Sequence, residues 1–241
     1  MSTERGNGST GIRAVILDYG QVLARCPTGE EFGRLAGMFN VSLAAFYELW
    51  EASRGPYDRG DLTAEEYWLK FAAQTNTSLD REQIKMLRVI EVEIWAHPIP
   101  GMLDWVSQLH AGGIKTGLLS NMPWDLVKHV RTNCRWIKNF VFQTLSAEVR
   151  LIKPDSAIYE HTLHGLGVSA AETLFVDDRE ENIRAARFLG IRAIQFRSLA
   201  QLKSDLEDLG FPILPAAAES SSIEESSSPL RLQDKPVVPA G

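Results

Sequence analysis

The chain has 241 residues, of which 44% are apolar and 23% charged, and its formal net charge is −6. This length suffices for one α/β domain with a small insertion, and the apolar content can bury a core. The longest apolar runs fall far short of the roughly 18 residues that cross a bilayer, and no dense Lys/Arg stripe offers itself to a phosphate backbone. We therefore expect a small-molecule substrate and neither nucleic acid nor membrane as a partner.

The cysteines and the N-terminal residues bear on the compartment. Cys26 and Cys134 are too few for a disulfide framework and lack the spacing of metal ligands. The first ten residues, MSTERGNGST, have no apolar stretch behind them that resembles a secretory signal. These features predict a cytoplasmic protein, which we expect to be a monomer or a homodimer.

Both ends of the chain are low in large apolar groups. Residues 1–10 and 213–241 hold few of them, and the C-terminal segment includes the run AAAESSSIEESSSP. Such segments cannot offset the entropy cost of ordering by burial. We expect a disordered N-terminus over 1–10 and a disordered tail over 213–241.

Strand-like and helical patterns alternate along the rest of the chain. The strand-like runs are 14–17, 115–119, 140–143, 173–176 and 192–196. Four of them are dominated by Val, Ile, Leu or Phe without clean alternation, which is typical of strands buried on both faces of a parallel sheet. Apolar residues at helical spacing fill the intervals 102–109, 155–166 and 181–189. The order predicts a doubly wound, Rossmann-like α/β sheet of about five parallel strands with right-handed crossovers.

The segment 28–96 has a different pattern. Its aromatic residues recur at helical spacing and no convincing strand interrupts them; they include Phe39, Phe46, Trp50, Tyr67, Trp68 and Phe71. We expect a small helical cap domain at 28–96, inserted into a catalytic core formed by 11–27 and 97–212.

Four polar features come directly or shortly after strand-like runs, where a doubly wound sheet binds its ligands. They are Asp18, Ser120-Asn121, Lys153-Pro154 and Asp177-Asp178. Singly, each has an ordinary explanation, because an Asp at a strand end often only caps a turn and a lone lysine is usually solvated. Two adjacent carboxylates repel each other unless a cation is present, and hard oxygen ligands suit Mg²⁺. The four features together predict an active site with bound Mg²⁺.

Here the chain resembles the haloacid dehalogenase (HAD) superfamily. The segments LDYGQVL, LLSN, IKPD and FVDD match the four motifs of that superfamily in order, and the resemblance covers roughly residues 12–210. The insertion after the first motif is similar to that of the subfamily with a helical cap. The longer segments look most like the sugar-phosphate phosphatases related to α-glucose-1-phosphatase. The resemblance implies a Mg²⁺-dependent phosphatase acting on a small phosphate ester, with a sugar phosphate favoured.

The resemblance also implies a role for each matched residue. Asp18 would attack phosphorus and form an aspartyl-phosphate, which splits one displacement into two easier ones. Ser120, Asn121 and Lys153 would hold the phosphoryl group. The implied ligands of Mg²⁺ are the carboxylates of Asp18, Asp177 and Asp178 and the backbone carbonyl of Gly20, with Asn182 orienting the aspartates.

Gly20 departs from the family pattern. Most HAD phosphatases carry at this position a second Asp that serves as general acid and base, and losing such a group costs about 10²–10⁴ in rate. Either turnover is then slow, or another group takes the place of the missing acid, or the leaving group needs little help. The anomeric hydroxyl of a sugar 1-phosphate is such a leaving group, and we take this third case as our hypothesis. Two alternatives stay open: a non-catalytic or weakly active HAD-like binding protein, and a 2-haloacid dehalogenase, which shares the nucleophile, lacks the second Asp and needs no metal.

Overall fold

The computed structural model describes residues 11–216. The expected disordered segments, 1–10 and the greater part of 213–241, lie outside the described residues. Five parallel strands form one sheet in the order β3-β2-β1-β4-β5. They are β1 (Ala14–Leu17), β2 (Lys115–Ser120), β3 (Phe142–Leu145), β4 (Thr173–Asp177) and β5 (Arg192–Gln195). The doubly wound sheet of five strands is thus confirmed, with β1 and its C-terminal Asp18 at the centre.

One strand begins later than the sequence predicts. The run 140–143 is apolar, yet β3 starts at Phe142. The backbone N–H of Phe140 donates to Ile137 O at 3.1 Å and closes a 3-10 turn. Val141 N then donates to Thr116 O at 2.8 Å, and the paired register with β2 begins at Phe142, opposite Gly117. The apolar side chain of Phe140 is buried in the core without being part of a strand.

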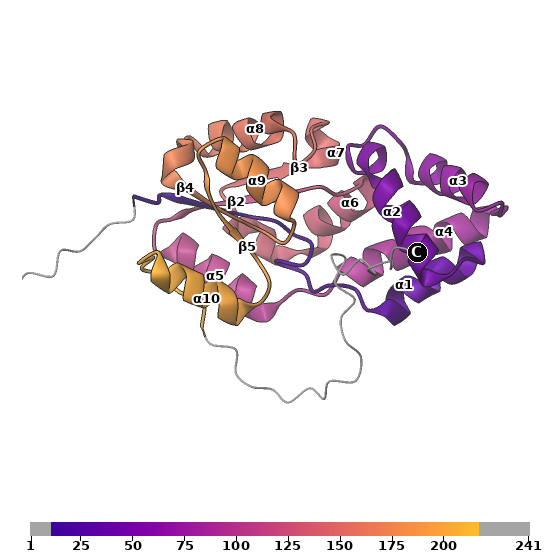
Figure 1. Ribbon diagram of the computed structural model, residues 1–241, viewed down its shortest axis with the longest axis horizontal. Coiled ribbons are helices and arrows are strands. Elements are labelled where there is room, and N and C mark those ends of the chain that lie inside the picture. Colours follow the sequence, from indigo (N-terminus) through magenta and orange to yellow (C-terminus); the bar gives the residue numbers. More distant parts are fainter. Residues whose placement is uncertain (1–10, 217–241) are drawn as a thin grey trace, which may run out of the picture.

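Helices cover both faces of the sheet (Figure 1). The side chains of Val15 and Leu17 point into one apolar cluster and those of Ala14 and Ile16 into another, because successive residues of a strand face opposite sides. The first cluster is filled from α5 (Pro100–Ala111), α6 (Trp124–Asn133) and α10 (Leu199–Asp208), and the second from α8 (Ser156–Leu166) and α9 (Glu180–Phe188). Short elements complete the core: α7 (Ser146–Val149) and the 3-10 turns η2 (Arg135–Asn139) and η3 (Ala170–Glu172).

A helical module, residues 29–95, lies between β1 and α5 and is drawn at the right of Figure 1. It comprises α1 (Gly29–Ala36), η1 (Gly37–Phe39), α2 (Leu43–Asp58), α3 (Ala64–Gln74) and α4 (Arg81–Trp95). Its own apolar cluster is rich in aromatic rings, such as Tyr57 and Tyr67, whose centroids are 4.1 Å apart. We infer that this module is the cap expected at 28–96.

Side-chain N-caps explain where the module's helices begin. Thr28, Ser42, Thr63 and Asp80 each accept a hydrogen bond from a backbone N–H of the first turn. Such caps satisfy N–H groups that have no partner within the helix and contribute about 1 kcal/mol each. No helix among residues 11–216 is long and apolar enough to cross a membrane.

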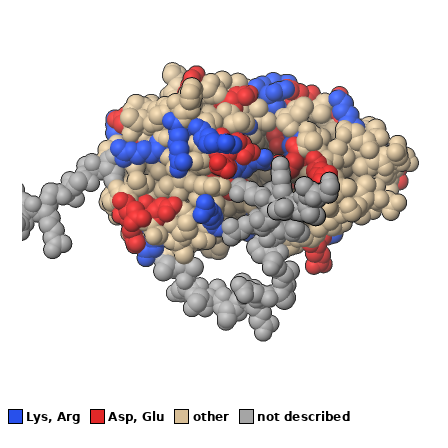
Figure 2. Space-filling model, in the orientation of Figure 1, with Lys and Arg blue, Asp and Glu red and all other residues tan. Residues whose placement is uncertain are grey.

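Charged side chains of both signs share the sheet edge beside β5. One shallow hollow there is lined by Arg184, Arg187, Arg192 and Arg197 and by Glu180, Asp205 and Asp208. On the face drawn in Figure 2, Lys and Arg side chains likewise lie next to Asp and Glu side chains. The opposite charges offset each other, so this edge is not a purely basic surface of the kind that a phosphate backbone requires.

Gly60 marks a close approach between the helical module and the core. Its φ is +80°, and a Cβ atom there would lie 2.9 Å from Trp124 Nε1 and 3.0 Å from the Ala147 carbonyl oxygen. We expect Gly60→Ala to lower the free energy of unfolding by about 1–3 kcal/mol, since it adds both backbone strain and overpacking. Urea unfolding measures the loss.

Gly33→Ala is the matched control for that variant. Gly33 lies within α1, and a Cβ there would meet nothing within 4 Å. Alanine in a helix interior is favoured over glycine by roughly 0.5–1 kcal/mol, so this variant should gain stability. Equal effects of the two substitutions would contradict the close approach at Gly60.

Candidate active site

The carboxyl ends of β1, β2 and β4 open into a cavity of about 280 Å³ between the core and the helical module. Asp18 follows β1, Ser120 ends β2, and Asp178 follows β4; all three line the cavity. Lys153 reaches the same cavity from the loop between β3 and α8. The structure therefore brings the four polar features predicted from the sequence to one place.

Lys153 lies between two carboxylates at the centre of the site. Its Nζ is 2.8 Å from Asp18 Oδ1 and 2.7 Å from Asp177 Oδ2, and its side chain is 1% exposed. Asn182 Nδ2 donates to both carboxylate oxygens of Asp177 at 3.0 Å. Asp177 is thus fixed from two sides, and it fixes the ammonium group of Lys153 beside Asp18.

The ionisation of these groups follows from burial and from their mutual charges. Burial raises the pKa of Asp18, the charge of Lys153 opposes the rise, and Asp177 adds to it. Burial, followed by the charges of Asp177 and Asp18, raises the pKa of Asp178 well above its usual range. Burial lowers the pKa of Lys153, but the two aspartates outweigh it and hold that pKa above its ordinary value. The site therefore holds one cationic lysine among three carboxylates, and the charge of that lysine does not balance the charges of all three.

The residues present fit a divalent cation. Asp18, Asp177 and Asp178 each offer a carboxylate oxygen, and these atoms lie within 4.8 Å of one another. Asp18 Oδ1 is buried, and its contact with Lys153 is an ion pair without hydrogen-bond geometry. Carboxylate oxygens are hard ligands of the kind that Mg²⁺ prefers. Gly20 lines the cavity two residues after Asp18, and its role as a carbonyl ligand stays a prediction.

Asn121 supports Lys153 through its side-chain amide. Its Nδ2 donates to Lys153 O at 2.9 Å, and its Oδ1 accepts from Lys153 N at 2.8 Å. Both ends of the amide are therefore engaged in positioning the lysine backbone. Binding of substrate by Asn121 and by Ser120, which is 2% exposed, stays a prediction.

Gln21 also lines the cavity, although no sequence motif singles it out. It has a φ of +57°, in the turn that follows Asp18. Its Nε2 donates to Asp178 Oδ2 at 2.8 Å and links the first motif to the fourth. A left-handed backbone at a glutamine carries no sequence signal, because glycine and asparagine are the residues that usually mark it.

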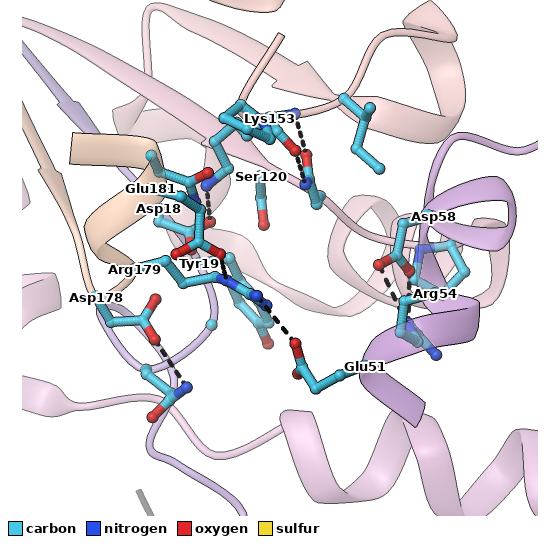
Figure 3. A pocket seen from close by; sticks show the side chains of 18 of the residues that line it. Asp18, Tyr19, Glu51, Arg54, Asp58, Ser120, Lys153, Asp178, Arg179 and Glu181 are labelled. Atoms are coloured by element: carbon cyan, nitrogen blue, oxygen red, sulfur yellow. Dashed lines mark hydrogen bonds and ion pairs between the residues drawn. The ribbon is translucent and has the colours of Figure 1, made fainter. Parts of the chain in front are cut away.

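The helical module contributes a second set of charged residues to the cavity. Glu51 of α2 pairs with Arg179 of the core at 2.9 Å, and Arg179 also pairs with Glu181 at 2.6 Å (Figure 3). Arg54 pairs with Asp58 at 2.6 Å. The helical pattern predicted the module, but it does not show which face of α2 meets the core, so sequence reasoning missed these residues.

Comparison with known proteins bears on this constellation. The model of the haloacid dehalogenase-like hydrolases matches residues 12–190. The chain belongs to this hydrolase family. The match contains Asp18, Lys153 and the paired aspartates, together with the whole helical module.

Curated relatives of the HAD chain are distant, and the matches cover only part of each of them. Acyl-CoA dehydrogenase family member 10 of Mus musculus is 26% identical over 229 residues, which are 86% of this chain and 20% of that protein. A sesquiterpene phosphatase of Aspergillus oryzae is 32% identical over 96 residues, 39% of this chain and 48% of that protein. A drimenol cyclase of Aspergillus calidoustus is 24% identical over 211 residues, 82% of this chain and 36% of that protein. The HAD chain thus spans less than half the length of each.

Solved structures share the fold. A HAD family enzyme of Bacteroides thetaiotaomicron has a TM-score of 0.65 at 22% identity, covering 78% of this chain and 94% of that one. Its complex with magnesium and inorganic phosphate has a TM-score of 0.62 at 22% identity, with 77% and 94% covered. L-2-haloacid dehalogenase of Xanthobacter autotrophicus, with chloropropionic acid covalently bound, has a TM-score of 0.59 at 18% identity, with 85% of both chains covered. These likenesses concern the HAD fold, including its helical module.

Proposed function

We propose that this HAD hydrolase is a Mg²⁺-dependent phosphatase that releases phosphate from a small phosphorylated metabolite through an aspartyl-phosphate on Asp18. The observation that carries the proposal is the placement of Lys153 Nζ at 2.8 Å from Asp18 and 2.7 Å from Asp177, beside three clustered carboxylates. A phosphatase among the relatives and a magnesium–phosphate complex among the structural neighbours support it.

The first half of the proposed reaction is a displacement at phosphorus. A carboxylate oxygen of Asp18 forms a bond to phosphorus while the bond from phosphorus to the ester oxygen breaks, and the electron pair leaves with that oxygen. Lys153 carries a fixed positive charge in a buried site, where it offsets the charge of the transferring group most effectively. Ser120 and the backbone beside it orient the phosphoryl oxygens. The oxygen of a water molecule then bonds to phosphorus, the bond from phosphorus to the Asp18 oxygen breaks, and inorganic phosphate leaves while the proton of that water passes to phosphate or solvent and Asp18 returns to the free carboxylate.

A bound Mg²⁺, held by Asp18, Asp177 and Asp178 and by the Gly20 carbonyl, would supply further positive charge at the phosphoryl oxygens. This requirement separates the phosphatase from a 2-haloacid dehalogenase, whose attack on carbon needs no metal. Three carboxylates with one lysine among them, and a raised pKa at Asp178, favour a site that binds a cation.

The first test is phosphate release from a panel of sugar phosphates and other small monoesters. With Mg²⁺ present we expect turnover on at least one of them, and EDTA should remove it while excess Mg²⁺ restores it. Free 2-chloropropionate should yield no chloride. Chloride release, or phosphate release that EDTA leaves unchanged, would contradict the proposed chemistry. If no compound of the panel released phosphate or chloride, a non-catalytic binding protein would be favoured instead.

The proposal includes the setting expected from the sequence. The substrate is a free small molecule, the compartment is the cytoplasm, and neither nucleic acid nor membrane takes part. The net charge of −6 and the two cysteines support this setting. The sugar phosphate favoured by the sequence resemblance is one member of the test panel.

A further inference from the structure

An indole ring fills the space beside Gly20. A Cβ atom on Gly20 would lie 3.3 Å from Cζ3 of Trp95, closer than side chains normally tolerate. Trp95 ends α4, and its backbone oxygen accepts a hydrogen bond from the Tyr19 hydroxyl at 2.6 Å. Its ring meets Phe32 edge-on, with centroids 6.5 Å apart. A side chain at position 20 would therefore crowd the ring of Trp95, which Tyr19 and Phe32 help to hold in place.

The acidic groups that line the cavity outside the three-aspartate cluster are already paired. Among residues 11–216, Glu51 and Glu181 share the guanidinium of Arg179, at 2.9 and 2.6 Å. Both carboxylate oxygens of Asp58 accept from Arg54. Protonating any of these carboxylates would break an ion pair. Among the described residues, the lining carboxylates outside the three-aspartate cluster are therefore all held in ion pairs, and none of them is a free acid beside Gly20.

Charge also limits the rest of the substrate. Arg54 and Arg179 line the cavity, but each is balanced by two carboxylates, since Arg54 pairs with Glu91 as well as Asp58. A second phosphate or carboxylate on the substrate would meet Glu51 and Asp58 without an available cation. Trp50, Trp95 and Tyr19 add aromatic surface to the same cavity. These walls therefore favour a neutral aromatic group over a charged one.

We propose that Trp95 makes this site selective for aryl phosphates, which are the phosphate monoesters of phenols, whose aryl group carries no charge. The inference rests on the proposed phosphatase function and names its substrate class. The bond from phosphorus to the aryl oxygen breaks as Asp18 attacks, and the electron pair leaves with an aryloxide that takes its proton from water. A phenol has a pKa near 10, so its oxygen leaves without an acid far more readily than an aliphatic alcohol does.

A series of leaving groups tests this selectivity with the full chain and Mg²⁺. Phenyl phosphate and p-nitrophenyl phosphate are compared with glucose 1-phosphate and ethyl phosphate. We expect kcat/KM to fall by about 10² or more from the aryl esters to ethyl phosphate, since no positioned acid assists the latter. Equal or faster turnover of ethyl phosphate or glucose 1-phosphate would overturn the selectivity and leave the phosphatase intact. No turnover of any ester would instead overturn the phosphatase.

Two double variants test whether the ring of Trp95 occupies the place from which an acid at position 20 could protonate the leaving group. Trp95→Ala opens the space, and Gly20→Asp or Gly20→Asn then fills it with a titrating or a non-titrating side chain of the same size. We expect the Asp variant to hydrolyse ethyl phosphate about 10²-fold faster than the Asn variant. Equal rates would overturn the inference. Glu51→Gln is a third arm: if it abolished ethyl phosphate turnover in the wild-type background, Glu51 would be the acid and Trp95 would not decide selectivity.

Binding without turnover gives an independent readout. In an Asp18→Asn background with Mg²⁺, calorimetry should show phenyl phosphate binding about tenfold more tightly than ethyl phosphate. Adding Trp95→Ala should remove that preference, whereas Trp95→Phe, which keeps an aromatic ring, should retain most of it. Thermal unfolding of each variant checks that the chain is folded. A preference that survives Trp95→Ala would assign aryl recognition to another part of the site.

Discussion

Asp18→Asn should reduce phosphate release by about 10⁴-fold or more, because the amide is no nucleophile toward phosphorus and nothing replaces the lost group. The substitution is isosteric, and Lys153 keeps its second partner, Asp177, at 2.7 Å. Folding should therefore survive. The measurement is single-turnover kinetics with the best substrate, together with mass spectrometry of acid-quenched enzyme. Wild-type protein should gain one phosphoryl group on Asp18, and the variant should gain none.

Asp104→Asn is the matched control for that loss. Asp104 is an exposed residue of α5 and does not line the cavity. The same chemical change there should leave kcat and KM within twofold of wild type. If Asp18→Asn retained more than a tenth of the activity, or if the phosphoryl group appeared on another residue, the assignment of the nucleophile would be wrong.

The sheet and the predicted core of the site could be read from local patterns. A short apolar run such as 14–17 is typical of a strand buried on both faces of a parallel sheet, and the residue after such a run then lies at the carboxyl edge. Asp18, Ser120 and Asp178 follow this rule, and the structure places all three at one cavity. Lys153 follows no strand directly. Its position depends on Asn121, whose amide binds the lysine backbone, and no single-sequence pattern encodes that pair.

The contacts across the cavity could not be predicted in the same way. Glu51, Arg54 and Trp95 come from helices whose orientation against the core is decided by packing, such as the close approach at Gly60. The sequence resemblance implies that glycine stands at position 20 where most HAD phosphatases carry an acid. Only the structure shows that the ring of Trp95 lies beside Gly20. This side of the cavity is therefore an aromatic surface.

Arg54→Met should lower the free energy of unfolding by about 3–5 kcal/mol at pH 8, since it leaves two buried carboxylates without their cation. Arg54 is paired with Asp58 at 2.6 Å and with Glu91, which is 1% exposed and also accepts a hydrogen bond from the Tyr57 hydroxyl at 3.0 Å. Its guanidinium lies 4.2 Å from the ring centroid of Trp50. Urea unfolding measures the loss.

Arg34→Met is the control for that variant in the same helical module. Arg34 pairs with Glu93 at 3.2 Å, and both side chains are about half exposed, at 45% and 52%. Exposed pairs contribute about 0.2–1 kcal/mol, so this variant should lose no more than that. Comparable losses for the two variants would show that the buried network does not stabilise the module.

The pH dependence of the Arg54→Met loss has a definite sign. Burial raises the pKa of Asp58 and of Glu91, and the charge of Arg54 opposes the rise in both. Without Arg54 both pKa values rise further above those of the unfolded chain. A group whose pKa is raised by folding favours the folded state at low pH and loses that contribution as pH rises through the folded value. The difference from wild type should therefore shrink when unfolding is measured at pH 5 instead of pH 8, and a loss that grew toward acid would mean that the carboxylates are not the groups left unpaired.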